Sequence, residues 1–82
     1  MKIYLTAKAH QQLSKIPQKM YEVIIEKIEK LRIDPLPTSS KKLINRQGWR
    51  IRAGDYRILY TIDSKKKELT ILSVAHRKEA YR

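Results

Sequence analysis

Cysteine is absent from this sequence of 82 residues, so neither a disulfide bond nor a thiolate metal site can stabilise the fold. Only two glycines are present, Gly48 and Gly54, which excludes a glycine-rich phosphate-binding loop. The eight acidic residues are scattered, and no two of them neighbour a histidine at metal-ligand spacing. We therefore expect no metal and no cofactor.

Long apolar runs are missing as well. No segment approaches the ~18 apolar residues of a membrane span, and the opening MKIYLTAKAHQQL contains no signal-peptide pattern. The lysine-rich, glycine-poor composition is typical of bacterial and archaeal proteins. We expect a cytoplasmic prokaryotic protein that makes no membrane contact and forms a single domain over residues 1–82.

Positive charge, in contrast, is abundant and unevenly distributed. Lysine and arginine total 19 against eight acidic residues, a net charge of +11. Residues 1–40 hold seven basic and four acidic residues, a net of +3, whereas residues 41–82 hold twelve and four, a net of +8. Such a field attracts nucleic acid, an acidic protein or an anionic membrane.

The first half of the chain predicts a strand followed by two helices. Residues 2–6 alternate as a short strand, and Thr6 can cap a helix over residues 7–16. Pro17 interrupts the helical pattern, and a second amphipathic helix ends before Pro35, with Glu26 and Lys30 spaced for an ion pair. Its apolar stripe consists of Met20, Val23, Ile24, Ile28 and Leu31. Residues 34–42 are a predicted loop because they are rich in proline and serine.

Residues 49–60, WRIRAGDYRILY, predict a β-hairpin with Gly54 and Asp55 as its two-residue loop. This loop fixes the register, so Arg52 faces Arg57 across the strands. Trp49, Ile51, Ala53, Tyr56, Ile58 and Tyr60 then share the face that the helices cover, and Arg50, Arg52, Arg57 and Leu59 share the other. Because opposed like charges destabilise a sheet, a cluster of arginines indicates an anionic ligand.

Residues 68–75, ELTILSVA, predict a further strand. If Ser64 to Lys66 form the preceding loop, Arg57 lies opposite Ser73, and Ala75 and Arg77 continue the arginine face. The predicted order is β-α-α-β-β-β, an α+β fold in which two helices pack on one face of a small, largely antiparallel sheet.

Clustered arginines can hold a phosphate with bidentate hydrogen bonds and stabilise the charge that develops when a phosphodiester is cleaved. Arginine stays protonated and cannot act as a base, so the cluster alone does not separate cleavage from simple binding. The segment AHRKEAYR adds His76, Lys78 and Tyr81 as partners for proton transfer. A cleavage without metal could use the 2′-hydroxyl of RNA as nucleophile, which DNA lacks.

The segments RAGDYRILYTID and ILSVAHRKEAYR closely resemble the RelE branch of the RelE/ParE toxin superfamily. The pattern of that branch is approximately R-x-G-x-Y-R-x-x-Y, followed by a strand that ends in H-R-x-x-x-Y-R. The resemblance extends over nearly the whole chain, since the length and the order of elements also agree. The second motif, with Arg77 and Tyr81, is typical of the branch that cleaves messenger RNA, and the gyrase-poisoning ParE branch generally lacks it.

The resemblance implies the toxin of a type II toxin–antitoxin system, a metal-independent endoribonuclease that cuts messenger RNA in the ribosomal A site. Its implied partners are the ribosome, messenger RNA and a cognate acidic antitoxin, and the free toxin is expected to be a monomer. Arg57 and Arg77 would stabilise the phosphate in the transition state, and Tyr81 would orient or deprotonate the attacking 2′-hydroxyl. Arg50 and Arg52 also belong to the implied site but stand where members often have lysine, which leaves His76 or Tyr81 as the base. The implied RNA-binding residues are Lys41, Lys42, Arg46, Lys78 and Arg82.

Two alternatives remain open from the sequence. The first is an inhibitor of DNA gyrase of the ParE kind, which acts by binding a protein. The second is a basic RNA-binding module without catalytic activity.

Overall fold

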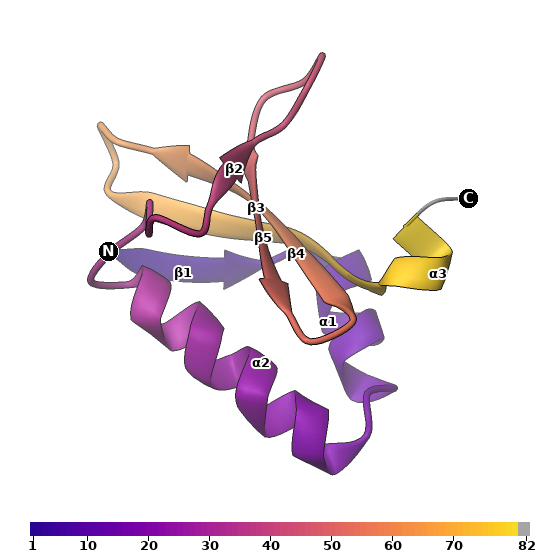
Figure 1. Ribbon diagram of the computed structural model, residues 1–82. Coiled ribbons are helices and arrows are strands. Elements are labelled where there is room, and N and C mark those ends of the chain that lie inside the picture. The colour runs from indigo at the N-terminus through magenta and orange to yellow at the C-terminus, as the bar shows by residue number, and fades with distance from the viewer. Residues whose placement is uncertain (81–82) are drawn as a thin grey trace.

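The computed structural model describes residues 1–80, with side chains through residue 78, so the predicted site residues Tyr81 and Arg82 lie outside the described residues. The elements in chain order are β1 (Lys2–Leu5), α1 (Ala7–Ser14), α2 (Gln18–Leu31), β2 (Lys41–Lys42), β3 (Trp49–Ala53), β4 (Tyr56–Asp63), β5 (Glu68–His76) and α3 (Arg77–Ala80). The strands form one sheet in the order β1-β5-β4-β3-β2, in which only the β1–β5 pair is parallel. Helices α1 and α2 lie on one side of this sheet (Figure 1). The predicted α+β class is confirmed.

Two short elements were not expected from the sequence. Lys41 and Lys42, predicted to lie in a loop, form the edge strand β2 opposite Arg50 and Trp49. Residues that follow β5 form the helical turn α3. Within residues 1–80, no helix is long and apolar enough to cross a membrane.

The core lies between the two helices and the covered face of the sheet. Its buried apolar side chains are Ala9 and Leu13 of α1, Ile24, Ile28 and Leu31 of α2, and Ile51, Ala53, Ile58, Tyr60, Leu69, Ile71 and Val74 of the sheet. The apolar stripe predicted for α2 was too wide. Val23 is 41% exposed, whereas Ile24 and Ile28 are buried. The predicted pair of Glu26 and Lys30 is present at 3.5 Å on the exposed side of α2.

The hairpin of β3 and β4 has the predicted register throughout. Ala53 pairs with Tyr56, Arg52 with Arg57, and Trp49 with Tyr60. Gly54 begins the two-residue turn with a φ of +60°, a left-handed conformation that glycine adopts without a Cβ clash. The two arginines are therefore held side by side on the face that α1 and α2 leave uncovered.

The register between β4 and β5 differs from the prediction in two compensating ways. The turn contains four residues, Ser64 to Lys67, instead of three, and a β-bulge at Leu72 inserts an unpaired residue into β5. Arg57 consequently pairs with Ala75, and Ser73 pairs with Leu59. Each change alone would exchange the two faces of the strand, whereas together they keep Ser73 and Ala75 on the arginine face.

Helix α1 fixes the bulged part of β5. The Thr6 hydroxyl accepts a hydrogen bond from Ala9 N–H at 3.1 Å, which caps α1, and donates one to the Leu72 carbonyl at 2.8 Å. Further along, Gln12 Oε1 accepts a hydrogen bond from Val74 N–H at 2.7 Å. Strand β1 pairs with β5 only as far as Ile71, so Thr6 and Gln12 satisfy backbone groups beyond the point where β1 ends.

The loop between α2 and β2 is held by the core residue Tyr60. Its hydroxyl donates a hydrogen bond to the Pro35 carbonyl at 2.7 Å, and its ring is fully buried. Burial raises the pKa of Tyr60 above its ordinary value of 10.0, because the charged phenolate would lose its hydration. The next loop, between β2 and β3, closes through a hydrogen bond from Leu43 N–H to the Gly48 carbonyl at 3.0 Å.

Candidate functional site

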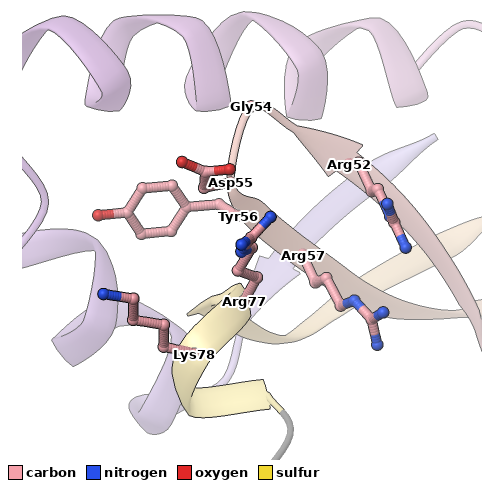
Figure 2. Close-up of a pocket in the computed structure, with 7 residues that line it drawn as sticks. All are labelled: Arg52, Gly54, Asp55, Tyr56, Arg57, Arg77 and Lys78. Carbon is pink, nitrogen blue, oxygen red and sulfur yellow. The ribbon is translucent and has the colours of Figure 1, made fainter.

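Three of the predicted arginines line one open hollow at the end of the β3–β4 hairpin. Arg52 of β3, Arg57 of β4 and Arg77 of α3 surround a space of about 320 Å³ (Figure 2). The remaining lining residues are Gly54, Asp55, Tyr56 and Lys78. We call this space the arginine hollow. Three arginines from different elements thus line one space.

Arg77 reaches the hollow because the start of α3 is attached to the hairpin turn. The Arg77 N–H donates a hydrogen bond to the Asp55 carbonyl at 2.7 Å. The Lys78 N–H donates to His76 Nδ1 at 3.2 Å, which satisfies a backbone donor of the first turn. In Figure 2 the Arg77 side chain lies between those of Tyr56 and Arg57, and Lys78 extends away from the arginines.

The described residues that line the arginine hollow carry an excess of positive charge. Within the described part of the chain, no ion pair involves Arg50, Arg52 or Arg77. The pairs Glu26–Lys30 and Glu29–Arg32 lie away from the hollow, on and after α2. Among the described residues that line the hollow, Asp55 is the one acidic residue. Arginines without a carboxylate partner among the described residues, as Arg52 and Arg77 are, raise the local potential and favour an anionic ligand.

A second, larger depression continues from Arg57 across the uncovered face of the sheet. It has a volume of about 690 Å³, and we call it the sheet groove. Its basic residues are Lys8, Lys42, Arg46, Arg50 and Arg57, and its other lining residues are Gln12, Leu43, Ile44, Leu59, Ser73 and Ala75. Arg50 therefore lies in this groove and not among the residues of the arginine hollow. Cationic side chains around an apolar floor suit a ligand that combines phosphates with flat bases.

A family model of the ParE toxin of type II toxin–antitoxin systems, parDE, matches residues 3–81. This chain belongs to that toxin family. The match covers the hairpin, the arginine hollow and the C-terminal motif as far as residue 81, and it confirms the predicted membership of the RelE/ParE superfamily. A search of curated protein sequences found no match.

Solved structures of related toxins have the same fold. A chain of the RelBE2 toxin–antitoxin complex of Mycobacterium tuberculosis is 30% identical, with a TM-score of 0.81 over 93% of this chain and 96% of that chain. The archaeal RelE–RelB complex of Pyrococcus horikoshii gives 23% identity and a TM-score of 0.79, covering 93% of each chain. The YoeB/ParE toxin of Agrobacterium tumefaciens is 17% identical, with a TM-score of 0.81 over 93% of this chain and 98% of that chain. The first two were solved as complexes with an antitoxin.

His76 lies apart from the arginines of the toxin. It pairs with Tyr56 across β4 and β5, so its ring points to the face that the helices cover. The two rings meet edge to face, with centroids 5.2 Å apart and planes at 86°. His76 lines a different hollow beside α1 and is not among the residues of the arginine hollow. His76 therefore does not line the hollow that contains Arg77, because its ring points to the covered face of the sheet, whereas Arg77 follows β5 as the first residue of α3.

The predicted RNA-binding residues have separate locations in the toxin. Lys42 and Arg46 line the sheet groove, and Lys78 lines the arginine hollow. Lys41 is exposed and pairs with Arg50 at the edge of the sheet, but it lines neither space. Tyr81 and Arg82 are outside the described residues, so their predicted positions remain predictions.

Sequence reasoning missed three charged or amide side chains that line these two spaces. Lys8 and Gln12 reach the sheet groove from α1, and Asp55 lines the arginine hollow from the turn. The spacing of Lys8 and Gln12 places both on one side of the helix, which was a usable signal. The packing of α1 against β5 determines that this side of the helix faces the groove, and the sequence does not indicate that packing.

Proposed function

We propose that the toxin is an endoribonuclease that cuts messenger RNA in the ribosomal A site, as its resemblance to the RelE branch implies. The observation that supports this most is the arginine hollow, which Arg52, Arg57 and Arg77 line together, with no ion-pair partner for Arg52 or Arg77 among the described residues. Such a constellation fits the additional negative charge that a phosphodiester acquires in its transition state.

The proposed reaction transfers the phosphate within the substrate and requires no metal. The 2′-oxygen loses its proton and attacks the adjacent phosphorus, the bond to the 5′-oxygen breaks, and that oxygen receives a proton. The products are a 2′,3′-cyclic phosphate and a 5′-hydroxyl. RNA is the substrate because DNA lacks the nucleophile.

Arg57 and Arg77 are the proposed phosphate ligands, with Arg52 as a third donor opposite Arg57. Each well-placed donor is worth about 3–4 kcal/mol in the transition state. We assign proton transfer to Tyr81 in preference to His76, because His76 lines a different hollow and its Nδ1 already accepts the Lys78 N–H. This assignment for Tyr81 rests on the family motif.

The ribosome and an acidic antitoxin are the proposed macromolecular partners. The sheet groove adds Lys42, Arg46 and Arg50 to the cations of the arginine hollow, and the whole chain has a net charge of +11. A polyanionic ribosome and an acidic antitoxin segment both complement this surface. Binding to RNA should weaken with salt, by about 0.7 logarithmic unit per logarithmic unit of salt for each phosphate contacted.

Single substitutions of Arg57 and Arg77 by alanine test the proposal. Each is expected to lower the cleavage rate on programmed ribosomes about 10²–10³-fold and to relieve growth arrest, while the thermal transition stays intact. Arg32→Ala is the matched control, because Arg32 is an exposed arginine that pairs with Glu29 beyond α2. Primer extension on messenger RNA, with and without ribosomes, locates the cuts. Full toxicity in both variants would contradict the assignment.

Inhibition of DNA gyrase is the second candidate function, and the description of the matching family as ParE toxins favours it. Under this alternative, induction produces DNA breaks and an SOS response while messenger RNA remains uncut. RNA that is bound but never cut would instead indicate a non-catalytic RNA-binding module.

A further inference from the structure

A third hollow lies between α1 and the C-terminal end of β5, and neither the arginine hollow nor the sheet groove accounts for it. Its volume is about 340 Å³, and we call it the α1 hollow. The lining residues are Lys8, Gln11, Gln12, Lys15, Ile16, Tyr56, Val74 and His76. It shares Tyr56 with the arginine hollow and both Lys8 and Gln12 with the sheet groove. The three spaces therefore adjoin one another around the end of β5.

One wall of the α1 hollow is a polar stripe on the helix. Lys8, Gln11, Gln12 and Lys15 follow the i, i+3, i+4, i+7 spacing of a single helix face. Gln12 anchors this wall to the sheet through its 2.7 Å hydrogen bond with Val74 N–H. Seven residues at 1.5 Å each separate the two lysines by about 10 Å along the helix axis. The wall thus presents two cations at a spacing set by the helix.

The opposite wall is aromatic. Tyr56 and His76 pack edge to face, and both line the hollow. Because His76 Nδ1 accepts the Lys78 N–H, the neutral ring carries its own proton on Nε2 and offers a donor there. No acidic side chain is among the described residues that line this space. Ammonium groups, amides and aromatic rings together are the chemical groups that bind single-stranded RNA.

We propose that the α1 hollow binds a nucleotide of the substrate strand that flanks the scissile linkage. The RNA would pass from the arginine hollow over Tyr56, the residue that both spaces share, to Lys8 and Lys15. The lysines contact backbone phosphates, which makes this subsite insensitive to base sequence. The inference rests on the proposed nuclease function and adds to it a path for the strand beyond the point of cleavage.

The test measures how salt affects RNA binding by lysine variants. Lys15→Gln is the principal variant, because Lys15 lines the α1 hollow and neither of the other two spaces. Lys66→Gln is the matched control, since Lys66 is exposed in the turn that precedes β5, at the far end of that strand from the hollow. The ligand is a fluorescent single-stranded RNA that is 2′-O-methylated throughout, so that no variant can cut it.

We expect Lys15→Gln to lower the slope of log Kd against log salt by about 0.7, the contribution of one single-strand phosphate. The double variant Lys8→Gln with Lys15→Gln should lower this slope by about 1.4, twice the contribution of one phosphate. The control Lys66→Gln should lower the slope by less than half as much as Lys15→Gln does. In ¹⁵N-labelled protein, the amides of Gln11, Gln12 and His76 should shift as the RNA is added. The same variants are also titrated against ribosomes that carry no messenger RNA.

Equal slopes for Lys15→Gln and Lys66→Gln would overturn the proposal. A loss of binding of the same size on vacant ribosomes would also overturn it, since the strand in the hollow would then be ribosomal. Failure of the nuclease function is recognised separately, because the wild-type toxin would leave messenger RNA uncut in the primer-extension experiment whatever the slopes.

Discussion

Replacing Thr6 by valine should destabilise the toxin far more than removing a solvent-exposed hydroxyl group would, because the Thr6 hydroxyl makes two hydrogen bonds. The change keeps the shape of the side chain but removes two hydrogen bonds, the cap on Ala9 N–H at 3.1 Å and the bond to the Leu72 carbonyl at 2.8 Å. An N-cap contributes about 1 kcal/mol, and a further hydrogen bond contributes about 0.5–1.5 kcal/mol. The expected loss in the free energy of unfolding is therefore about 2 kcal/mol.

In a domain of this size, 1 kcal/mol corresponds to about 4–8 °C in Tm, so Thr6→Val should melt about 8–16 °C below the wild type. Thr6→Ser is the control, because it retains the hydroxyl and both hydrogen bonds. Circular dichroism melts give Tm, and urea titrations give the free energy of unfolding. If Thr6→Val lies within about 0.5 kcal/mol of Thr6→Ser, the hydroxyl does not hold α1 to the bulge and the reasoning fails.

Two further predictions concern the loops on either side of β2. Tyr60→Phe should cost about 1 kcal/mol near neutral pH by removing the hydrogen bond to Pro35. Because burial raises the pKa of Tyr60 above 10.0, its stabilising contribution is complete below pH 10 and is lost as the pH rises through the folded-state value. Urea unfolding at pH 8 and pH 11 should therefore bring wild type and Tyr60→Phe closer together at the higher pH, and a constant difference would contradict this. Gly48→Ala should cost about 3 kcal/mol, because φ is +127° and an added Cβ would lie 2.9 Å from the Tyr60 carbonyl oxygen. Gly54→Ala, with φ at +60° and only the flexible end of Met20 at 3.0 Å, should cost about 1 kcal/mol, so equal Tm values for the two alanine variants would refute the comparison.

The β3–β4 hairpin could be predicted in full because its information is local. Gly54 and Asp55 form a loop of two residues, and the alternation on each side then determines every cross-strand pair, including Arg52 with Arg57. The helices were equally accessible, since Thr6 caps α1 as expected and the apolar spacing of α2 is strong. These elements depend on neighbours within a few positions in the sequence.

The register of β5 against β4 could not be predicted, although the strand itself was, because the groups that determine the register are distant in the sequence. The Leu72 carbonyl at the bulge accepts a hydrogen bond from Thr6, and the nearby Val74 N–H donates one to Gln12. The segment ELTILSVA alone indicates neither Thr6 nor Gln12 as a partner. The location of His76 outside the arginine hollow has a related cause. A histidine next to Arg77 in the sequence suggests a shared site, whereas the pleat sends its ring to Tyr56 on the other face.

The bulge also determines which length changes the gene could tolerate. Deleting the single codon for Leu72 would remove the bulge and bring Ser73 directly after Ile71, so Ser73 would still pair with Leu59 and Val74 with Ile58. Deleting Val74 instead would bring Ala75 opposite Ile58 and turn His76 to the arginine face. For this segment, the place of a one-residue deletion therefore decides whether the two faces of the strand are kept.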